Sequence, residues 1–285
     1  MRNFRIIPRL DIKGANLVKG IHLEGLRVLG NPEEFAFEYY KKGADEILYQ
    51  DVVASLYKRN SLLDQISKIN KKIFIPLIVG GGIRSIDDIK KILKAGADKI
   101  IINTAAVKNP KFITEAARIF GSSTIVVAIE VTKDRNGNYF VFTDNGREKT
   151  DKDALNWALE AESRHAGEII ITSIDREGTG EGLDFEFIEK ISKKTKIPIV
   201  AHGGASEIDD IINIFKKTEV SGVSISSMLH YNIVANRDEK FIKNHNLNGN
   251  LTFLNSKRKF KNFGAYDLLQ IKNKMKKSKL FSKET

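Results

Sequence analysis

Short apolar segments alternate with amphipathic segments along most of this chain. Helical patterns about a dozen residues long, such as 31–43 and 85–96, lie between the apolar segments, and the second should begin after Ser85 as N-cap and end at Gly96. The apolar segments are rich in Val and Ile, as strands covered on both faces of a parallel sheet are. The eight predicted strands are residues 4–12, 46–53, 75–81, 99–105, 124–131, 168–175, 197–204 and 222–228. This alternation predicts repeated βα units.

The chain also contains an internal repeat, in which residues 75–104 and 197–227 are versions of each other. The aligned pairs are Pro76 with Pro198, Gly81-Gly82 with Gly203-Gly204 and Glu46 with Glu168, all 122 residues apart, and Asp11 with Glu130, 119 apart. Eight βα units with a half-length repeat predict an α/β fold, a single (β/α)8 TIM barrel with half-barrels of about 1–120 and 121–285. A doubly wound open sheet is the alternative, but it seldom carries a four-plus-four duplication.

Composition limits the class of protein. The 285 residues are 41% hydrophobic and 29% charged, which suits one large globular core. The absence of cysteine excludes disulfides and thiolate metal sites and is compatible with a reducing compartment. There is no 18-residue apolar run and no signal-like N-terminal segment. We therefore expect a cytoplasmic protein that has no membrane association and uses neither a metal nor another cofactor.

The net charge of +11 is concentrated near the C-terminus. Residues 235–285 hold 13 Lys/Arg and 4 Asp/Glu, so the repeated core is almost balanced. Nucleic-acid binding is one interpretation of such a basic segment. No nucleic-acid motif and no regularly spaced aromatic residues accompany it, so a solvated lysine-rich helix is favoured and no nucleic-acid partner is expected.

In a TIM barrel, the catalytic side chains stand at the carboxyl ends of the strands. The first and fifth predicted strands present Asp11 and Glu130 there, on opposite sides of the barrel. Two carboxylates whose environments separate their pKa values can act as general base and general acid. An acidic residue at a strand end is also a common loop or cap residue, but here both halves of the repeat carry one.

Glycines and hydroxyl side chains follow other strands in both halves. Glycine lets the backbone approach an anion closely, and Ser or Thr adds hydrogen-bond donors. The two sets are Gly80-Gly81-Gly82 with Asn103-Thr104, and Gly203-Gly204 with Ser226-Ser227. Tight strand-to-helix turns are the purely structural alternative. The symmetry favours two phosphate sites, and so a ligand that is phosphorylated at both ends.

Charged residues stand at the opposite ends of alternate strands, where apolar residues would pack better. They are Arg5, Glu46, Lys99 and Glu168. Two acids and two bases predict a salt-bridged ring that closes the bottom of the barrel. The sequence pattern does not distinguish a structural plug from a gate.

Several motifs resemble one known family, the cyclase subunit of imidazole glycerol phosphate synthase. The resemblance covers about residues 4–233, and its motifs are RIIPRLDIKG, LVKGIHLEGLR, VGGGIRS, INTAAVKNP, SIDREGTG and HGGA. A related single-chain isomerase acts one step earlier on a similar bisphosphate. The charged ring and DKIIINTAAV are more similar to the cyclase.

The resemblance implies a lyase-type enzyme of histidine biosynthesis with a twofold repeated barrel. Such a cyclase forms a heterodimer with a glutaminase subunit that docks on the bottom face and supplies ammonia through the barrel. It converts a phosphoribulosyl aminoimidazole carboxamide nucleotide to imidazole glycerol phosphate and aminoimidazole carboxamide ribotide. The substrate carries two phosphates, in agreement with the two glycine turns.

The resemblance also implies roles for individual residues. Asp11 and Glu130 would be the acid–base pair, and Lys19 on the first loop would close over the substrate. The site would be lined by Asp51, Thr172 and Glu177. One phosphate would be held by Gly82, Asn103 and Thr104, and the other by Gly178, Gly204, Ser226 and Ser227. The ammonia gate would consist of Arg5, Glu46, Lys99 and Glu168, and the glutaminase contact would include Asp98 and Lys99.

The chain departs from the family pattern near the expected active face. The family has aspartate at the positions of Glu130 and Glu177, a small residue at His202 and cysteine at Arg9. About 30 residues, near 233–262, also look inserted as a polar loop before the last helix, which is predicted within 263–279.

These departures leave two alternatives beside the family activity. One is a paralogue that delivers ammonia to a sugar amidotransferase in surface-polysaccharide synthesis. The other is a catalytically silent scaffold for the glutaminase. Fold alone does not choose among them.

Overall fold

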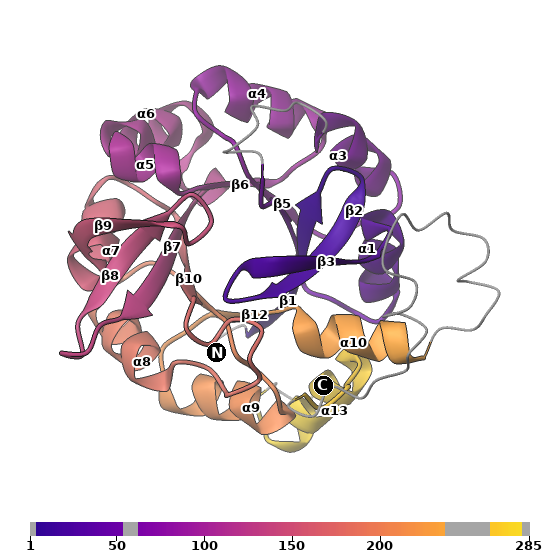
Figure 1. Cartoon of the computed structure of the whole chain (residues 1–285). Helices are drawn as coiled ribbons and strands as arrows, with labels where there is room; N and C mark the ends of the chain where they lie inside the picture. Colours follow the sequence, from indigo (N-terminus) through magenta and orange to yellow (C-terminus); the bar gives the residue numbers. More distant parts are fainter. Residues whose placement is uncertain (1–3, 54–61, 237–262, 281–285) are drawn as a thin grey trace.

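A closed barrel of eight parallel strands forms the centre of the molecule (Figure 1). The computed structural model describes residues 4–53, 62–236 and 263–280. The barrel strands are β1 (Arg5–Lys13), β4 (Ile47–Asp51), β5 (Leu77–Gly80), β6 (Lys99–Ile102), β7 (Ile125–Lys133), β10 (Glu168–Ser173), β11 (Ile199–His202) and β12 (Gly222–Ile225). Each strand pairs with the next, and pairing of β1 with β12 closes the circle. All eight predicted strands and the (β/α)8 fold are confirmed, and closure excludes the open sheet.

Helices surround the barrel (Figure 1). They are α1 (Pro32–Lys41), α3 (Leu62–Asn70), α4 (Ile86–Ala95), α5 (Thr104–Lys108), α6 (Lys111–Phe120), α7 (Ala154–Ser163), α8 (Phe185–Lys194), α9 (Ile208–Lys217), α10 (Ser227–Ala235) and α13 (Leu268–Lys277), with a 3-10 turn η1 (Ser122–Thr124). The predicted ends of α4 are confirmed, since Ser85 forms a capping box with Asp88 and Gly96 adopts the left-handed conformation. No helix in the described ranges is long and apolar enough to cross a membrane.

Two β-hairpins were not predicted. The strands β2 (Asn16–Ile21) and β3 (Glu24–Gly30) follow β1, whereas β8 (Tyr139–Thr143) and β9 (Glu148–Asp153) follow β7. Each hairpin extends the first strand of a half-barrel, and the two lie on opposite sides of the barrel mouth (Figure 1). The duplication therefore includes the hairpins as well as the βα units.

Strand side chains form two buried layers, because successive residues point to opposite faces of a strand. One set, such as Ile6, Leu77 and Val79, packs against the helices. The inward set fills the barrel itself and consists of Ile7, Leu48, Ile78, Ile101, Val126, Ile170 and Val200. We call these seven residues the axial layer. The axial layer makes the interior a packed core with the charged strand starts on one side and the candidate site on the other.

The predicted start of the inserted loop near the C-terminus differs slightly from the structure. The predicted loop near 233–262 begins within α10, which continues to Ala235. Residues 237–262 lie outside the described part of the chain. The last helix, α13, falls within the predicted 263–279 but begins at Leu268, where Asp267 caps it.

Candidate active site

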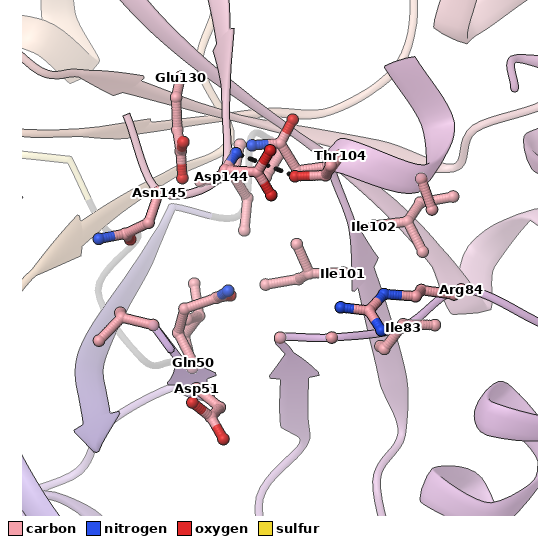
Figure 2. Close-up of a pocket in the computed structure, with 18 of the residues that line it drawn as sticks. Gln50, Asp51, Ile83, Arg84, Ile101, Ile102, Thr104, Glu130, Asp144 and Asn145 are labelled. Atoms are coloured by element: carbon pink, nitrogen blue, oxygen red, sulfur yellow. Dashed lines mark hydrogen bonds between the residues drawn. The ribbon is translucent and has the colours of Figure 1, made fainter. Parts of the chain in front are cut away.

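A cavity of about 370 Å³ opens at the carboxyl ends of the strands, mainly those of the first half-barrel. Its floor contains the axial-layer residues Leu48, Ile101 and Ile170. Figure 2 shows Gln50 and Arg84 extending toward the same space. Five predicted site residues line this cavity: Asp51, Gly82, Asn103, Thr104 and Glu130. The structure therefore brings together one predicted phosphate set and one predicted catalytic carboxylate.

Asp11 is buried beside the cavity rather than in its wall. Its Oδ1 accepts a hydrogen bond of 2.8 Å from Arg9 Nε, and Arg9 lines the cavity. Burial acts to raise the pKa of Asp11, but the charges of Arg9 and Lys19 outweigh it and hold that pKa below its ordinary value. Asp11 is therefore a carboxylate at neutral pH.

Glu130 has the opposite electrostatic environment. Burial raises the pKa of Glu130 to about 7, against the effect of Arg9 and of the Gly146 N–H that donates to Oε2 over 2.8 Å. The negative charges of Asp11 and Asp144 contribute to the increase. The two carboxylates on β1 and β7 thus have pKa values pushed apart, as an acid–base pair requires.

The first predicted phosphate set has a backbone suited to an anion. Gly81 and Gly82 both have positive φ, 112° and 68°, so their backbone adopts a conformation that residues with a Cβ rarely adopt. The buried Asn103 Oδ1 has no hydrogen-bond partner among the described residues. Thr104 Oγ1 accepts from the Asp144 backbone N–H at 3.0 Å, the bond drawn in Figure 2. A ligand phosphate at Gly82 would have these groups as neighbours.

The second predicted phosphate set surrounds a separate, much smaller cavity of about 10 Å³. Five of the predicted site residues line it: Glu177, Gly178, Gly204, Ser226 and Ser227. The buried side-chain atoms His202 Nε2, Ser224 Oγ and Ser227 Oγ, all from its lining, have no hydrogen-bond partner among the described residues. Buried polar atoms are rarely left unpaired, so three in one cavity indicate a place for a polar ligand.

The hairpin β2–β3 lies against this second cavity. Lys19, on β2, forms a fully buried ion pair with Glu177. His22 N donates to Glu177 O at 2.8 Å, and a Cβ added at Gly178 would lie 2.5 Å from Gly20 O, so the two backbones approach closely. Lys19 was predicted on a loop, and the structure corrects this to a strand. Thr172 and Lys19 line neither cavity.

His202 is neutral in this environment. Burial and the positive charge of Arg9 lower the pKa of His202 to about 3. Its Nδ1 therefore carries the proton and donates to Ser224 O at 2.9 Å, which leaves Nε2 as an acceptor 3.8 Å from Glu177 Oε1.

Replacement of Gly203 by Ala should destabilise the fold strongly. Gly203 has φ of 104°, and an added Cβ would lie 2.6 Å from Ser173 O, so strain and overlap add. We expect a loss of about 3 kcal/mol in the free energy of unfolding, measured with urea. Gly121→Ala is the matched control, because φ is 87° there and nothing lies within 4 Å of the added Cβ. Equal losses for both variants would contradict the role of the close backbone approach.

The predicted charged ring is present at the amino ends of the strands. Arg5 contacts Glu46 at 3.0 Å and also pairs with Glu168. Lys99 contacts Glu46 at 2.9 Å and Glu168 at 3.0 Å, so charges alternate around a closed ring. Asp98 is exposed at the same end of the barrel, and its Oδ2 accepts from the Leu77 N–H. The ring is confirmed as a structure, and its use as a gate remains a prediction.

Several residues of the site were not predicted as site residues. They are Arg9, Gln50, Arg84, Lys108, Asp144 and Asn145. Asp144 and Asn145 come from the tip of the β8–β9 hairpin, and the Asn-Gly pair at 145–146 is a known hairpin signal that could have located them. Arg9 precedes Asp11 by two residues, so strand periodicity places both on one face. The described residues contain no group of three or more Asp, Glu or His that could hold a metal ion.

Comparisons with known proteins identify one family. A family model described as "Histidine biosynthesis protein" matches residues 5–235, from the first residue of β1 to the last of α10. A Legionella pneumophila protein, "Imidazole glycerol phosphate synthase subunit HisF", is 52% identical over 210 residues, which cover 74% of this chain and 99% of that protein.

Two further relatives carry the same name. The protein from Alkaliphilus metalliredigens is 43% identical over 231 residues, covering 81% of this chain and 92% of the relative. The protein from Hydrogenobaculum sp. is 46% identical over 227 residues, which cover 80% of this chain and 90% of the relative. These shares span at least 90% of the length of each relative. This chain therefore belongs to the histidine biosynthesis protein family, in the group of imidazole glycerol phosphate synthase HisF subunits.

Proposed function

We propose that this chain is the lyase-type cyclase subunit of an imidazole glycerol phosphate synthase. It uses ammonia to convert a phosphoribulosyl aminoimidazole carboxamide nucleotide to imidazole glycerol phosphate and aminoimidazole carboxamide ribotide. The observation that carries the proposal is the pair Asp11 and Glu130, on equivalent strands of the two half-barrels, with pKa values pushed in opposite directions. The names of the relatives do not favour the polysaccharide paralogue.

The two carboxylates divide the proton transfers. Asp11, held ionised by Arg9, accepts a proton as the general base. Glu130 still carries a proton at about neutral pH and donates it as the general acid. Such positioned proton transfers contribute about 10²–10⁴-fold each to a rate.

The two glycine turns support a ligand with two phosphates. Gly82, Asn103 and Thr104 belong to the large cavity, and Gly178, Gly204 and Ser227 to the small one. The cavities lie at the carboxyl ends of opposite halves of the barrel, so a bisphosphate that reaches both must cross the mouth between Asp11 and Glu130. The small second cavity and the closed β2–β3 hairpin require that Lys19 and its hairpin move when this ligand enters.

The charged ring supports passage of ammonia from a partner. Arg5, Glu46, Lys99 and Glu168 close the bottom of the barrel, directly opposite the site. Above the ring lies the apolar axial layer, which favours neutral ammonia over ammonium. We infer that a glutaminase subunit docks in the cytoplasm on this face, near Asp98, and that the ring opens for its product.

The test is turnover with ammonium salts. Purified chain would be mixed with the ribulosyl carboxamide substrate at pH 7, with and without ammonium chloride, and loss of substrate absorbance and formation of imidazole glycerol phosphate would be followed. We expect turnover only with ammonium. No turnover with ammonium, nor with a glutaminase subunit and glutamine, would favour the silent scaffold and end the proposal.

A further inference from the structure

Arg9 occupies an unusual place for an arginine, in the interior of the barrel. It precedes Asp11 by two residues on β1, so both side chains point to the inside. Its Nε donates to Asp11 Oδ1 at 2.8 Å, and its Nη1 donates to Thr172 Oγ1 at 3.2 Å. Thr172 belongs to β10, so the guanidinium reaches from one half-barrel to the other. Two partners from two strands fix its position, and only 4% of the residue is exposed.

The guanidinium faces the large cavity, whereas its partners do not. Arg9 lines this cavity together with Leu48, Ile101 and Ile170 of the axial layer, but Asp11 and Thr172 are absent from the lining. The other cations of the lining in the described chain, Arg84 and Lys108, are exposed. Arg9 is therefore the buried cation at the inner end of the cavity, where ammonia that has crossed the axial layer would arrive.

Arg9 retains donors for a ligand. A guanidinium has five N–H groups, and the bonds to Asp11 and Thr172 use two of them. The acidic side chains around it are Asp11 on β1, Glu130 on β7 and Glu177 after β10. A fixed, permanently charged fork of donors, itself buried at the inner end of a cavity, is the arrangement that stabilises negative charge developing on an oxygen.

We propose that Arg9 is a catalytic residue that binds the carbonyl oxygen of the ribulosyl chain and stabilises the charge formed there when ammonia adds. This inference rests on the proposed function and deepens it. In the step, the ammonia lone pair forms the C–N bond, and the π pair of the carbonyl moves to the oxygen. Arg9 neutralises that oxygen without losing a proton. With the β2–β3 hairpin, which pairs with Asp11, moved aside by the entering ligand, Asp11 accepts a proton from the new ammonium nitrogen. Glu130 donates one to the oxygen, so charge and protons balance.

The test separates catalysis from structure through kcat and binding. Arg9→Met would be compared with wild type, with Arg9→Lys and with Arg118→Met, a matched loss of an exposed arginine on α6. We expect Arg9→Met to lower kcat by about 100-fold, with less than about a tenfold change in substrate Kd measured without ammonia. Arg9→Lys should keep part of the rate, since it retains the charge but not the fork. A kcat within twofold of wild type for folded Arg9→Met would overturn the proposal.

Two additions keep the result decisive. Arg9→Met leaves Asp11 buried and unpaired, so thermal unfolding is measured for every variant. If the single variant does not fold, Arg9→Met/Asp11→Asn, which removes both charges, is compared with Asp11→Asn; a further fall in kcat supports the role of Arg9, and an equal kcat overturns it. If wild type itself shows no ammonia-dependent turnover, the proposed function fails, and the inference is decided by substrate binding. In that case a loss of affinity of about fivefold or more in Arg9→Met supports the contact with the ligand, and unchanged affinity overturns it.

Discussion

Replacing Asp11 by Asn should lower kcat by about 10³-fold, because a carboxamide cannot accept the proton that Asp11 takes as the general base. Asn keeps the shape of the side chain and an oxygen that Arg9 can donate to, so the fold should persist. The variant nevertheless loses the charge that offsets the buried guanidinium, and breaking such a pair costs about 3 kcal/mol. Steady-state kinetics with ammonium and urea unfolding measure the two effects.

The matched control for this substitution is Asp87→Asn on α4. Asp87 is exposed and, within the described residues, pairs with Lys91 one turn later, so its loss should leave both kcat and the urea midpoint nearly unchanged. If Asp11→Asn kept more than a tenth of the wild-type kcat, Asp11 would not be the general base.

Glu130→Gln should lower kcat by about 10²–10³-fold and change its pH dependence. The acid form of Glu130 is the active one, and with a pKa of about 7 this form is lost as the pH rises through 7. Wild-type kcat should therefore fall on the alkaline side, with a midpoint near pH 7. The glutamine variant should lack this fall, because its side chain does not titrate.

The same pKa predicts a stability difference. In the folded chain Glu130 keeps its proton up to about pH 7, whereas in the unfolded chain it loses it near pH 4.5. Between these values the folded state binds more protons, so the contribution of Glu130 to stability is present below pH 4.5 and is lost as the pH rises to 7. Glu130→Gln should remove this loss, and urea unfolding at pH 5 and pH 8 measures it.

Glu130→Asp is the informative comparison for geometry. It keeps a carboxyl group but shortens the side chain by one methylene, which withdraws the oxygen that accepts from Gly146 N. A displacement of about 1 Å can cost about 100-fold in rate. Full activity in Glu130→Asp would show that this distance is not critical, whereas full activity in Glu130→Gln with an unchanged alkaline midpoint would remove Glu130 from the proton transfer.

The barrel could be predicted from the sequence because its strands are buried on both faces. Such strands are continuous apolar runs, and the internal repeat fixes their number independently. The hairpins β2–β3 and β8–β9 have weaker patterns, since β3 and β9 carry many exposed positions, such as Lys149 and Asp151 on β9. The β8–β9 turn, at Asn145-Gly146, carried a usable signal, whereas the β2–β3 turn is formed by His22 and Leu23, which are not typical turn residues.

The site was partly predictable for a similar reason. The repeat located both glycine turns and both carboxylates, because equivalent residues recur at a fixed offset. Contacts across the barrel have no such signal in one sequence. The pairing of Arg9 with Asp11 and Thr172, and of Lys19 with Glu177, depends on which side chains meet after the barrel closes. These contacts also show that Arg9 lines the cavity and contacts Asp11 behind it, which strand position alone does not indicate.

The central claim is that the two equivalent half-barrels each bind one phosphate of the ligand, so that the ligand lies across the acid–base pair. The most direct test is calorimetric binding of the bisphosphorylated substrate, without ammonia, beside two analogues that each lack one phosphate. We predict that removal of either phosphate weakens binding by at least about tenfold, the equivalent of about 1.4 kcal/mol. An analogue with a single phosphate that binds as tightly as the bisphosphate would contradict the two-anchor site.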